Sequence, residues 1–216
     1  MTSSPIVIDV ADGEHSGRAG NGVRHELAAA ALRLFAQQGY DATTVDMIAT
    51  AAGTTRRTFF RYFETKAGVL WHGFDAEIAD LTRELTAMPP TMSVMTAVRQ
   101  AVLAVNHYRR GDRAELRARL TLVTTVPELA ASATAHYDTW AAVVSQFAAR
   151  RCAVPPDSLY PQLVGRTALA ACRTAFDRWV ARPEVDLEHY LDTALRALAT
   201  GFPDVVIVAE PPPLAR

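Results

Sequence analysis

The stretch TTVDMIATAAGTTRRTFFRYFETK, residues 43–66, decides the fold of this chain. Its apolar residues at helical spacing are Val45, Ile48, Ala49 and Ala52. Gly53 ends the helix that they predict, and Thr54 or Thr55 can cap a second helix, which runs only to about Phe63. The stretch therefore predicts two short helices joined by a tight turn.

A third helix is expected just before this stretch. Leu27, Ala31, Leu34 and Phe35 recur at helical spacing within residues 23–38. Gly39 follows, where a left-handed helix end costs least. Thr43 and Asp46 resemble a capping box in which Asp replaces the usual Glu.

The rest of the chain also predicts helices, because Ala and Leu are abundant and prolines interrupt the apolar pattern at intervals. The expected helices span residues 65–88, 92–107, 112–124, 127–151, 157–180 and 186–200. No convincing run of strand-forming residues lies among them, so we expect an all-α protein.

Composition restricts the function. Half of the 216 residues are hydrophobic and the formal net charge is −1, so any nucleic-acid binding must come from a local basic patch. Two cysteines are too few for a zinc site. No secretory signal and no apolar run near the ~20 residues of a membrane span is visible, so we expect a soluble cytoplasmic protein.

The second short helix interleaves cations with aromatic residues. An arginine at its start, Arg56 or Arg57, can donate two hydrogen bonds to guanine O6 and N7, and Phe60 can contact a thymine methyl group. The residues suited to phosphate oxygens are Thr58, Tyr62 and Lys66. The alternative is a solvated arginine face backed by core aromatics. Lys66 is the only lysine of the chain.

Residues 24–69 resemble the amino-terminal domain of TetR-type transcriptional regulators. The matching features are Leu34-Phe35, Gly39-Tyr40, Thr44, Ile48-Ala49, Ala52-Gly53, Thr58-Phe59-Phe60-Arg61-Tyr62-Phe63 and Lys66. The resemblance implies base contacts at Arg56 and Arg57, and a central aromatic at Phe60, where many members have tyrosine. The DNA-binding residues expected overall are Thr44, Thr55, Arg56, Arg57, Thr58, Phe60, Arg61, Tyr62 and Lys66.

The resemblance implies the two domains, and composition without periodicity predicts the two ends. We expect a disordered arm at residues 1–22, a three-helix helix-turn-helix domain at 23–65, a helical ligand-binding and dimerisation domain at 66–202, and a disordered tail at 203–216. A narrower resemblance, to regulators of the mycofactocin system, rests on residues 56–63, Trp71, Phe74-Asp75, 120–129 and 137–140.

The larger domain shows no catalytic constellation, no metal-ligand spacing and no sign of a cofactor. Apolar helices can enclose a pocket as well as a core. Candidates to line a pocket, each with plain core packing as the alternative, are Trp71, Phe74, Leu103, Tyr108, Leu122, Trp140 and Phe176. The narrower resemblance suggests a long-chain acyl-CoA effector, and the cluster Arg109, Arg110, Arg113 and Arg117 could hold its nucleotide.

These expectations combine into a homodimeric, ligand-responsive repressor that binds a palindromic DNA operator. Its recognition helices would lie about one DNA turn, ~34 Å, or a multiple apart. The expected dimer surface consists of Leu163, Leu169, Ala170, Cys172, Phe176, Leu191, Leu195 and Leu198. The alternative is a helical acyl-binding enzyme or carrier that uses the same fold.

Overall fold

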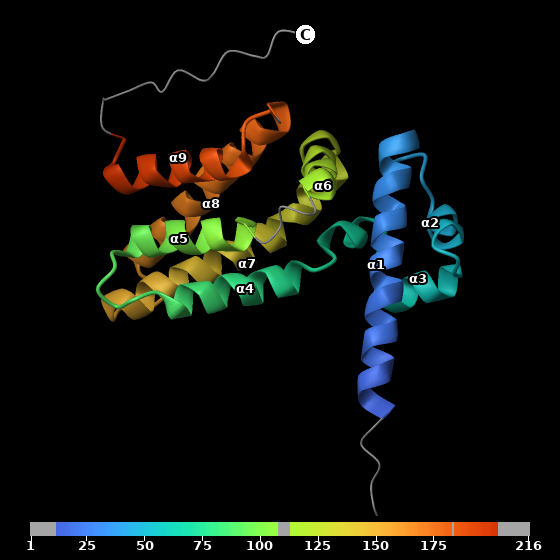
Figure 1. Ribbon diagram of the computed structural model, residues 1–216, viewed down its shortest axis with the longest axis horizontal. Coiled ribbons are helices and arrows are strands. Elements are labelled where there is room, and N and C mark those ends of the chain that lie inside the picture. Colours follow the sequence, from blue (N-terminus) through green and yellow to red (C-terminus); the bar gives the residue numbers. More distant parts are fainter. Residues whose placement is uncertain (1–11, 108–112, 183, 203–216) are drawn as a thin grey trace, which may run out of the picture. The chain divides into compact units, whose positions relative to one another are not determined.

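The computed structural model describes residues 12–107, 113–182 and 184–202. Within these ranges the chain is helical and forms no strand, which confirms the predicted all-α class (Figure 1). The elements are α1 (Asp12–Gln38), α2 (Val45–Ala51), α3 (Arg56–Tyr62), the 3-10 helix η1 (Ala67–Trp71), α4 (Phe74–Ala87), α5 (Val94–His107), α6 (Arg113–Thr125), α7 (Pro127–Cys152), α8 (Leu159–Ala181) and α9 (Leu187–Thr200).

The ends of the chain lie partly outside this description. Residues 1–11 of the predicted arm and the predicted tail at 203–216 are not among the described residues. The first helix begins at Asp12, earlier than the Val23 that apolar periodicity predicts. No helix in the described part of the chain is long and apolar enough to cross a membrane.

The chain divides into two compact units. The first comprises Met1–Asp75 and Ala114–Ser132, and it holds α1, α2, α3, η1 and nearly all of α6. The second comprises Ala76–Arg113 and Ala133–Arg216, and it holds α5, α8, α9 and most of α4 and α7. A segment far along the sequence, α6, is therefore part of the same compact unit as the two short helices.

In the first unit α2 packs on α1 and on α3 (Figure 1). The core combines the apolar face of α1 with one large side chain from each short helix, Ile48 and Phe59, both fully buried. Phe59 and Phe63 lie with ring centroids 5.6 Å apart, and both are buried, as their four-residue spacing predicts. Burial of these aromatic side chains fixes α3 on the unit.

The turns of the first unit follow the predicted glycines. Gly39 and Gly53 have φ of 89° and 65°, in the left-handed region that a side chain disfavours. The predicted capping box is wrong: Thr44 caps α2, with its hydroxyl accepting from the Met47 amide at 3.2 Å. Thr43 is instead buried and donates to the Gly39 carbonyl oxygen at 2.8 Å.

The long helix predicted over residues 65–88 is interrupted. The Thr65 hydroxyl accepts a hydrogen bond from the Gly68 amide at 3.1 Å, but the helix that follows is the 3-10 helix η1, whose N-cap position is Lys66. Gly73, with φ of 84°, then breaks the chain before α4 starts at Phe74. A left-handed residue cannot continue a right-handed helix, which is why apolar spacing alone overran this break.

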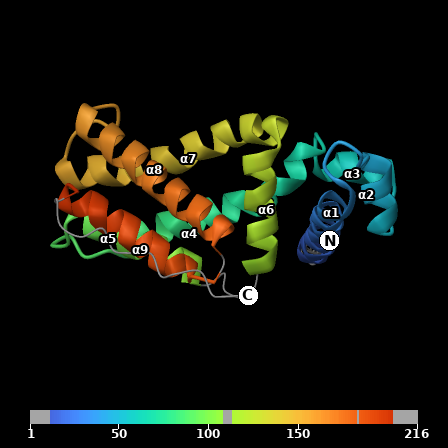
Figure 2. The same ribbon diagram turned by 90° about the horizontal axis from the view of Figure 1, so that it is seen from above.

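The second unit is a helical bundle in which α9 packs on both α5 and α8 (Figure 2). The remaining predicted helices are confirmed, with ends that differ by a few residues. Cys172, Leu191 and Leu195 are buried where α8 and α9 meet. They are therefore unavailable to a second copy, and this part of the predicted dimer surface is wrong.

Two polar or close contacts organise this bundle. Asp192 of α9 binds Arg99 of α5 and Arg196 of its own helix. Burial alone would raise the pKa of Asp192, but the hydrogen bonds from the two guanidinium groups lower it. Gly165 of α8 lies so close to α7 that a Cβ atom would overlap Ala141 O and Ser145 Oγ.

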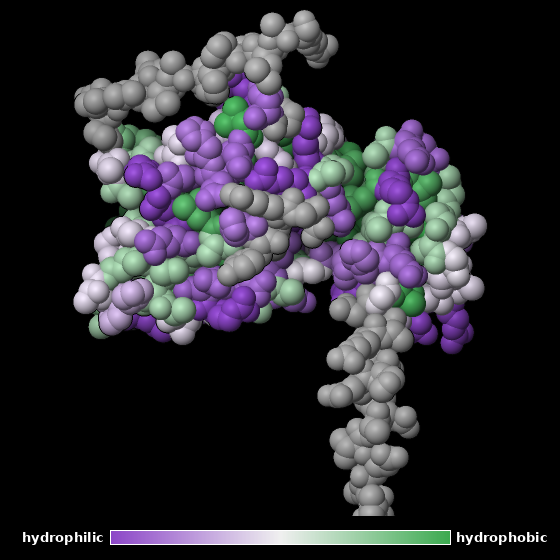
Figure 3. Space-filling view, in the orientation of Figure 1, coloured by the Kyte–Doolittle hydropathy of each residue, from purple (hydrophilic) through white to green (hydrophobic). Residues whose placement is uncertain are grey.

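The face shown in Figure 3 intermixes hydrophobic and hydrophilic residues.

The only lysine closes the first unit. Lys66 Nζ donates to the carbonyl oxygens of Tyr40, at 2.7 Å, and Thr43, at 3.1 Å. The same ammonium lies 3.9 Å from the centroid of the Tyr40 ring, within cation–π range. This Lys66 clamp, the ammonium with the two carbonyl groups, ties the segment after α3 to the turn between α1 and α2.

Replacing Lys66 with Met keeps an unbranched stem and removes the ammonium, so two carbonyl groups lose their donor. We expect the free energy of unfolding to fall by about 1–3 kcal/mol. Denaturant unfolding of the full chain without DNA measures this. Arg57→Met, which removes an exposed cation from α3, should change it by less than about 0.5 kcal/mol. Equal stabilities of the two variants would contradict a structural role for the clamp.

Candidate nucleic-acid interface

The cap of α3 determines which side chains begin this helix and face outward from it. Thr55 has an extended backbone, and its hydroxyl accepts from the Thr58 amide at 3.2 Å, so Thr55 is the cap of the two that the sequence allows and α3 begins at Arg56. The cap fixes Arg56 and Arg57 as the first two helical residues. Both are exposed. A recognition helix reads base edges with residues from this end.

Arg56 is held on two sides. Its Nη1 donates to Asp46 Oδ2 of α2 at 2.7 Å, and its Cζ lies 5.2 Å from the centroid of the Phe60 ring. Phe60 is 45% exposed, and its ring meets the buried Phe59 ring edge-on at 5.4 Å. Arg56 and Phe60, four residues apart on α3, thus make a direct cation–π contact.

The other end of α3 presents Arg61 and Tyr62. Arg61 Nη2 donates to the Tyr62 hydroxyl at 3.1 Å, and the guanidinium lies 4.8 Å from the centroid of that ring. Thr44, at the start of α2, uses its hydroxyl oxygen as a cap acceptor, so the hydroxyl proton remains for a phosphate oxygen. Thr44 and Tyr62 stay predictions as phosphate contacts, and Arg61 stays a predicted DNA contact.

None of the nine predicted DNA-contacting residues is buried, and all belong to the first unit. The exposed ones are Thr44, Thr55, Arg56, Arg57, Phe60 and Arg61, and the half-buried ones are Thr58, Tyr62 and Lys66. Lys66 already uses two of its three N–H donors in the clamp. One donor is left for the phosphate contact that the sequence predicts.

Residues outside the predicted set also support this surface. Tyr40 donates from its hydroxyl to Glu128 Oε1 at 2.8 Å, which links the turn before α2 to the first turn of α7. Burial, and then the Glu128 carboxylate, raise the pKa of Tyr40, so the phenol stays a donor. No local pattern could reveal this pair, because its members are 88 positions apart.

His72 lies between η1 and α4. Its ring centroid is 5.7 Å from that of His25 and 6.4 Å from that of Phe63. Burial and then the guanidinium of Arg24 lower the pKa of His72, which favours the neutral imidazole. Its Nδ1 is buried and has no hydrogen-bond partner among the described residues. The end of η1 is therefore lined by rings and cations that disfavour a further positive charge.

The predicted pocket residues are distributed over both units. Trp71, Phe74 and Leu122 belong to the first unit, and Leu103, Trp140 and Phe176 to the second. Tyr108 lies outside the described residues. All six described members are half-buried, so none belongs to the sealed core. Trp71 packs edge-on against Phe74 at 6.3 Å between centroids, and its Nε1 donates to Ser132 Oγ at 3.2 Å.

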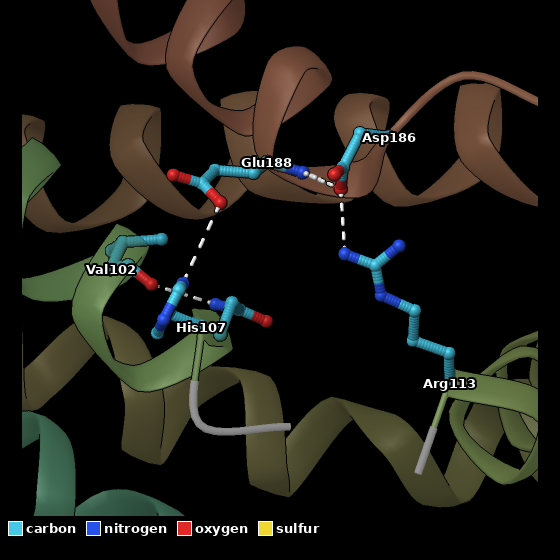
Figure 4. A network of polar contacts seen from close by, with 6 residues as sticks. Val102, His107, Arg113, Asp186 and Glu188 are labelled. Carbon is cyan, nitrogen blue, oxygen red and sulfur yellow. Dashed lines mark hydrogen bonds and ion pairs between the residues drawn. The ribbon is translucent and has the colours of Figure 1, made fainter. Parts of the chain in front are cut away.

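The predicted arginine cluster is only partly described, since Arg109 and Arg110 lie outside the described residues. Arg113 Nη2 binds Asp186 Oδ1 at 2.8 Å, and the same carboxylate caps α9 through the Glu188 amide (Figure 4). His107 Nδ1 lies 3.8 Å from Glu188 Oε2 beside it. Arg113 thus anchors the start of α6 to the start of α9.

Among the described residues, no group of three or more His, Cys, Asp or Glu side chains could hold a metal ion. The chemistry that the geometry brings together is instead a set of exposed guanidinium groups and hydroxyls on a rigid pair of short helices. That arrangement suits hydrogen bonds to phosphates and to base edges.

Comparison with known proteins also indicates a DNA-binding regulator. Residues 27–70 match the bacterial regulatory proteins of the tetR family, and residues 92–203 match the MftR C-terminal domain. Over 186 residues the chain is 31% identical to the protein of Mycobacterium tuberculosis (strain ATCC 25618 / H37Rv) named as the mycofactocin biosynthesis transcriptional regulator MftR. That alignment covers 86% of this chain and 94% of the relative.

Two solved structures share the fold. One is the repressor FadR of Thermus thermophilus with lauroyl-CoA, with a TM-score of 0.57, 24% identity, and coverage of 87% of this chain and 98% of that one. The other is SmeT of Stenotrophomonas maltophilia with triclosan, with a TM-score of 0.63, 20% identity, and coverage of 90% and 100%. Because the amino-terminal match contains the whole α2–α3 region and the carboxy-terminal match spans α5 to α9, the chain belongs to the TetR family of bacterial transcriptional regulators.

Proposed function

We propose that this regulator is a homodimeric repressor that binds a palindromic operator through α3 and is released by a small apolar effector. The observation that carries the proposal is the start of α3, where Arg56 and Arg57 are exposed on a helix whose opposite face is fixed by the buried Phe59. Such a helix can enter the major groove without changing its own packing.

The division of labour on this surface follows from side-chain chemistry. The guanidinium groups of Arg56 and Arg57 can donate two bonds each to a guanine edge, and Phe60 can pack on a thymine methyl group. The hydroxyls of Thr44 and Thr58, and the remaining donor of Lys66, suit phosphate oxygens, which set register but carry no sequence information.

The dimer surface that we propose is the exposed side of α8. Leu159, Tyr160 and Leu163 are 83%, 49% and 54% exposed, which is unusual for large apolar side chains on one helix. Ala170 continues the same side two turns later and is also exposed. In a two-fold dimer the same patch serves both copies, so one apolar stripe is enough to form the interface.

An apolar effector is supported by Leu103, Trp140 and Phe176, which are half-buried in the second unit, and by the ligands of two related structures. The FadR structure holds lauroyl-CoA, and the SmeT structure holds triclosan. These two ligands share an apolar body. For this chain we propose a long-chain acyl-CoA, which would bind more tightly to the state that does not fit the operator. A coupling of about 1–3 kcal/mol would change operator affinity 5- to 150-fold.

Replacing both Arg56 and Arg57 with Ala should abolish sequence-specific DNA binding and leave the helical content unchanged. The measurement is a mobility-shift titration with the duplex that the wild type selects from a random pool. Arg83→Ala, which removes an exposed arginine from α4, is the control and should bind like the wild type. If the double variant kept wild-type affinity, the start of α3 would not read the operator and the proposal would fail.

Replacing Leu159 and Leu163 with Asp should convert the dimer to a monomer, because two charges would face their symmetry copies in the interface. Sedimentation equilibrium measures the mass in solution. Thr86→Asp, at an exposed site of α4, adds one charge elsewhere and should leave the dimer intact. A dimer that survives both leucine substitutions would place the interface on another face.

Palmitoyl-CoA should raise the thermal midpoint of the full chain and weaken operator binding. At 100 times the dissociation constant, binding to the folded state alone adds about 2.7 kcal/mol of stability. Coenzyme A without the acyl chain is the control and should shift the midpoint much less. Equal shifts from both compounds, or none from either, would contradict the acyl-CoA effector.

A further inference from the structure

Asp46 makes an ion pair on the α3 surface in addition to its place in the first turn of α2. It lies in the first turn of α2, where the helix dipole stabilises a negative charge. Thr44 already provides the cap of this helix. Its Oδ2 lies 2.7 Å from Arg56 Nη1 on the neighbouring helix α3. The two side chains are ten positions apart, and each is more than half exposed.

The guanidinium is restrained from a second direction by the Phe60 ring, 5.2 Å away. That ring is itself fixed, because it packs edge-on at 5.4 Å against Phe59, which is fully buried. An exposed arginine normally exchanges among many rotamers. Here a carboxylate and an aromatic face together favour one of them.

The restraint leaves the arginine free to read a base. A guanidinium carries five N–H donors in a rigid fork, and the bond to Asp46 uses one of them. A guanine edge needs two, at O6 and N7. Arg61, by comparison, rests on the ring and hydroxyl of its neighbour Tyr62 and is not paired with a carboxylate in the described structure.

We propose that Asp46 is a specificity-determining residue of the DNA-reading surface. It holds Arg56 in the orientation that contacts guanine, and its negative charge opposes any pose in which this arginine would bind a phosphate instead. The inference rests on the proposed function, since it assigns a role within the same α3 surface.

The carboxylate acts differently on the two kinds of DNA. Its repulsion of phosphates disfavours binding to every sequence. Only a duplex with guanine at the right step regains this loss through the oriented contact of Arg56. Removing the charge should therefore strengthen binding to random DNA more than binding to the selected site. An exposed ion pair adds little to stability, so a purely structural role would leave this preference unchanged.

The test is binding-site selection from a random duplex pool with the full chain. The wild type should enrich a palindromic motif, and Asp46→Asn should lose enrichment at one G·C pair in each half-site. The ratio of affinities for the selected and random duplexes should fall about tenfold, the range for one bidentate base contact. Asp41→Asn removes the same charge from an exposed position of the same unit and should keep the motif.

A double-mutant cycle separates the mechanism from a general charge effect. In an Arg56→Ala background, Asp46→Asn should cause no further loss of preference, because the group that it orients is gone. An unchanged motif in Asp46→Asn, or the same loss in the Arg56→Ala background, would overturn the inference and leave the proposed function standing. If the wild type itself enriched no motif, the proposed function and this inference would both fail.

Discussion

The DNA-reading unit, which is the first compact unit with the helix α3, depends on the ammonium group of Lys66. The helix-turn-helix has little core of its own, because α2 and α3 are each only seven residues long. The Lys66 clamp binds backbone at Tyr40 and Thr43, so it joins the entry of this region to its exit. Bonds to backbone carbonyls hold the fold of the turn itself, whatever side chains surround it. The clamp therefore adds to the burial of Phe59 and Phe63, which fixes α3 on this unit.

The clamp also extends beyond the short helices. Tyr40 stacks on the Lys66 ammonium from one side and donates its hydroxyl to Glu128 of α7. Trp71 of η1 makes a second bond to the same helix, at Ser132. Residues Ala114–Ser132, distant in sequence, therefore belong to the DNA-reading unit by packing. At its other end α6 starts at Arg113, which Asp186 holds.

Sequence reasoning predicted what local chemistry determines. Glycines at 39 and 53, a threonine cap before α3 and apolar spacing sufficed to define α2 and α3 and the exposed arginines at the start of α3. It failed where a three-dimensional arrangement decides. The break at Gly73 depends on a positive φ within an otherwise helical pattern. The leucines of α9 look the same in sequence whether they face a partner or, as observed, α5 and α8. An ion pair such as Asp46–Arg56 joins two helices, so it can be predicted only when the placement of α2 against α3 is known.

Because the chain contains one lysine, the clamp can be modified chemically at a single side chain. Every other basic side chain besides the histidines is an arginine, so Lys66 carries the only ε-amino group. Among side chains, amine-directed acylation or reductive methylation has this one as its target. Acetylation would neutralise the cation and leave one N–H where the clamp now uses two. In this regulator, modification of a single amine would act directly on the geometry of the DNA-reading helices.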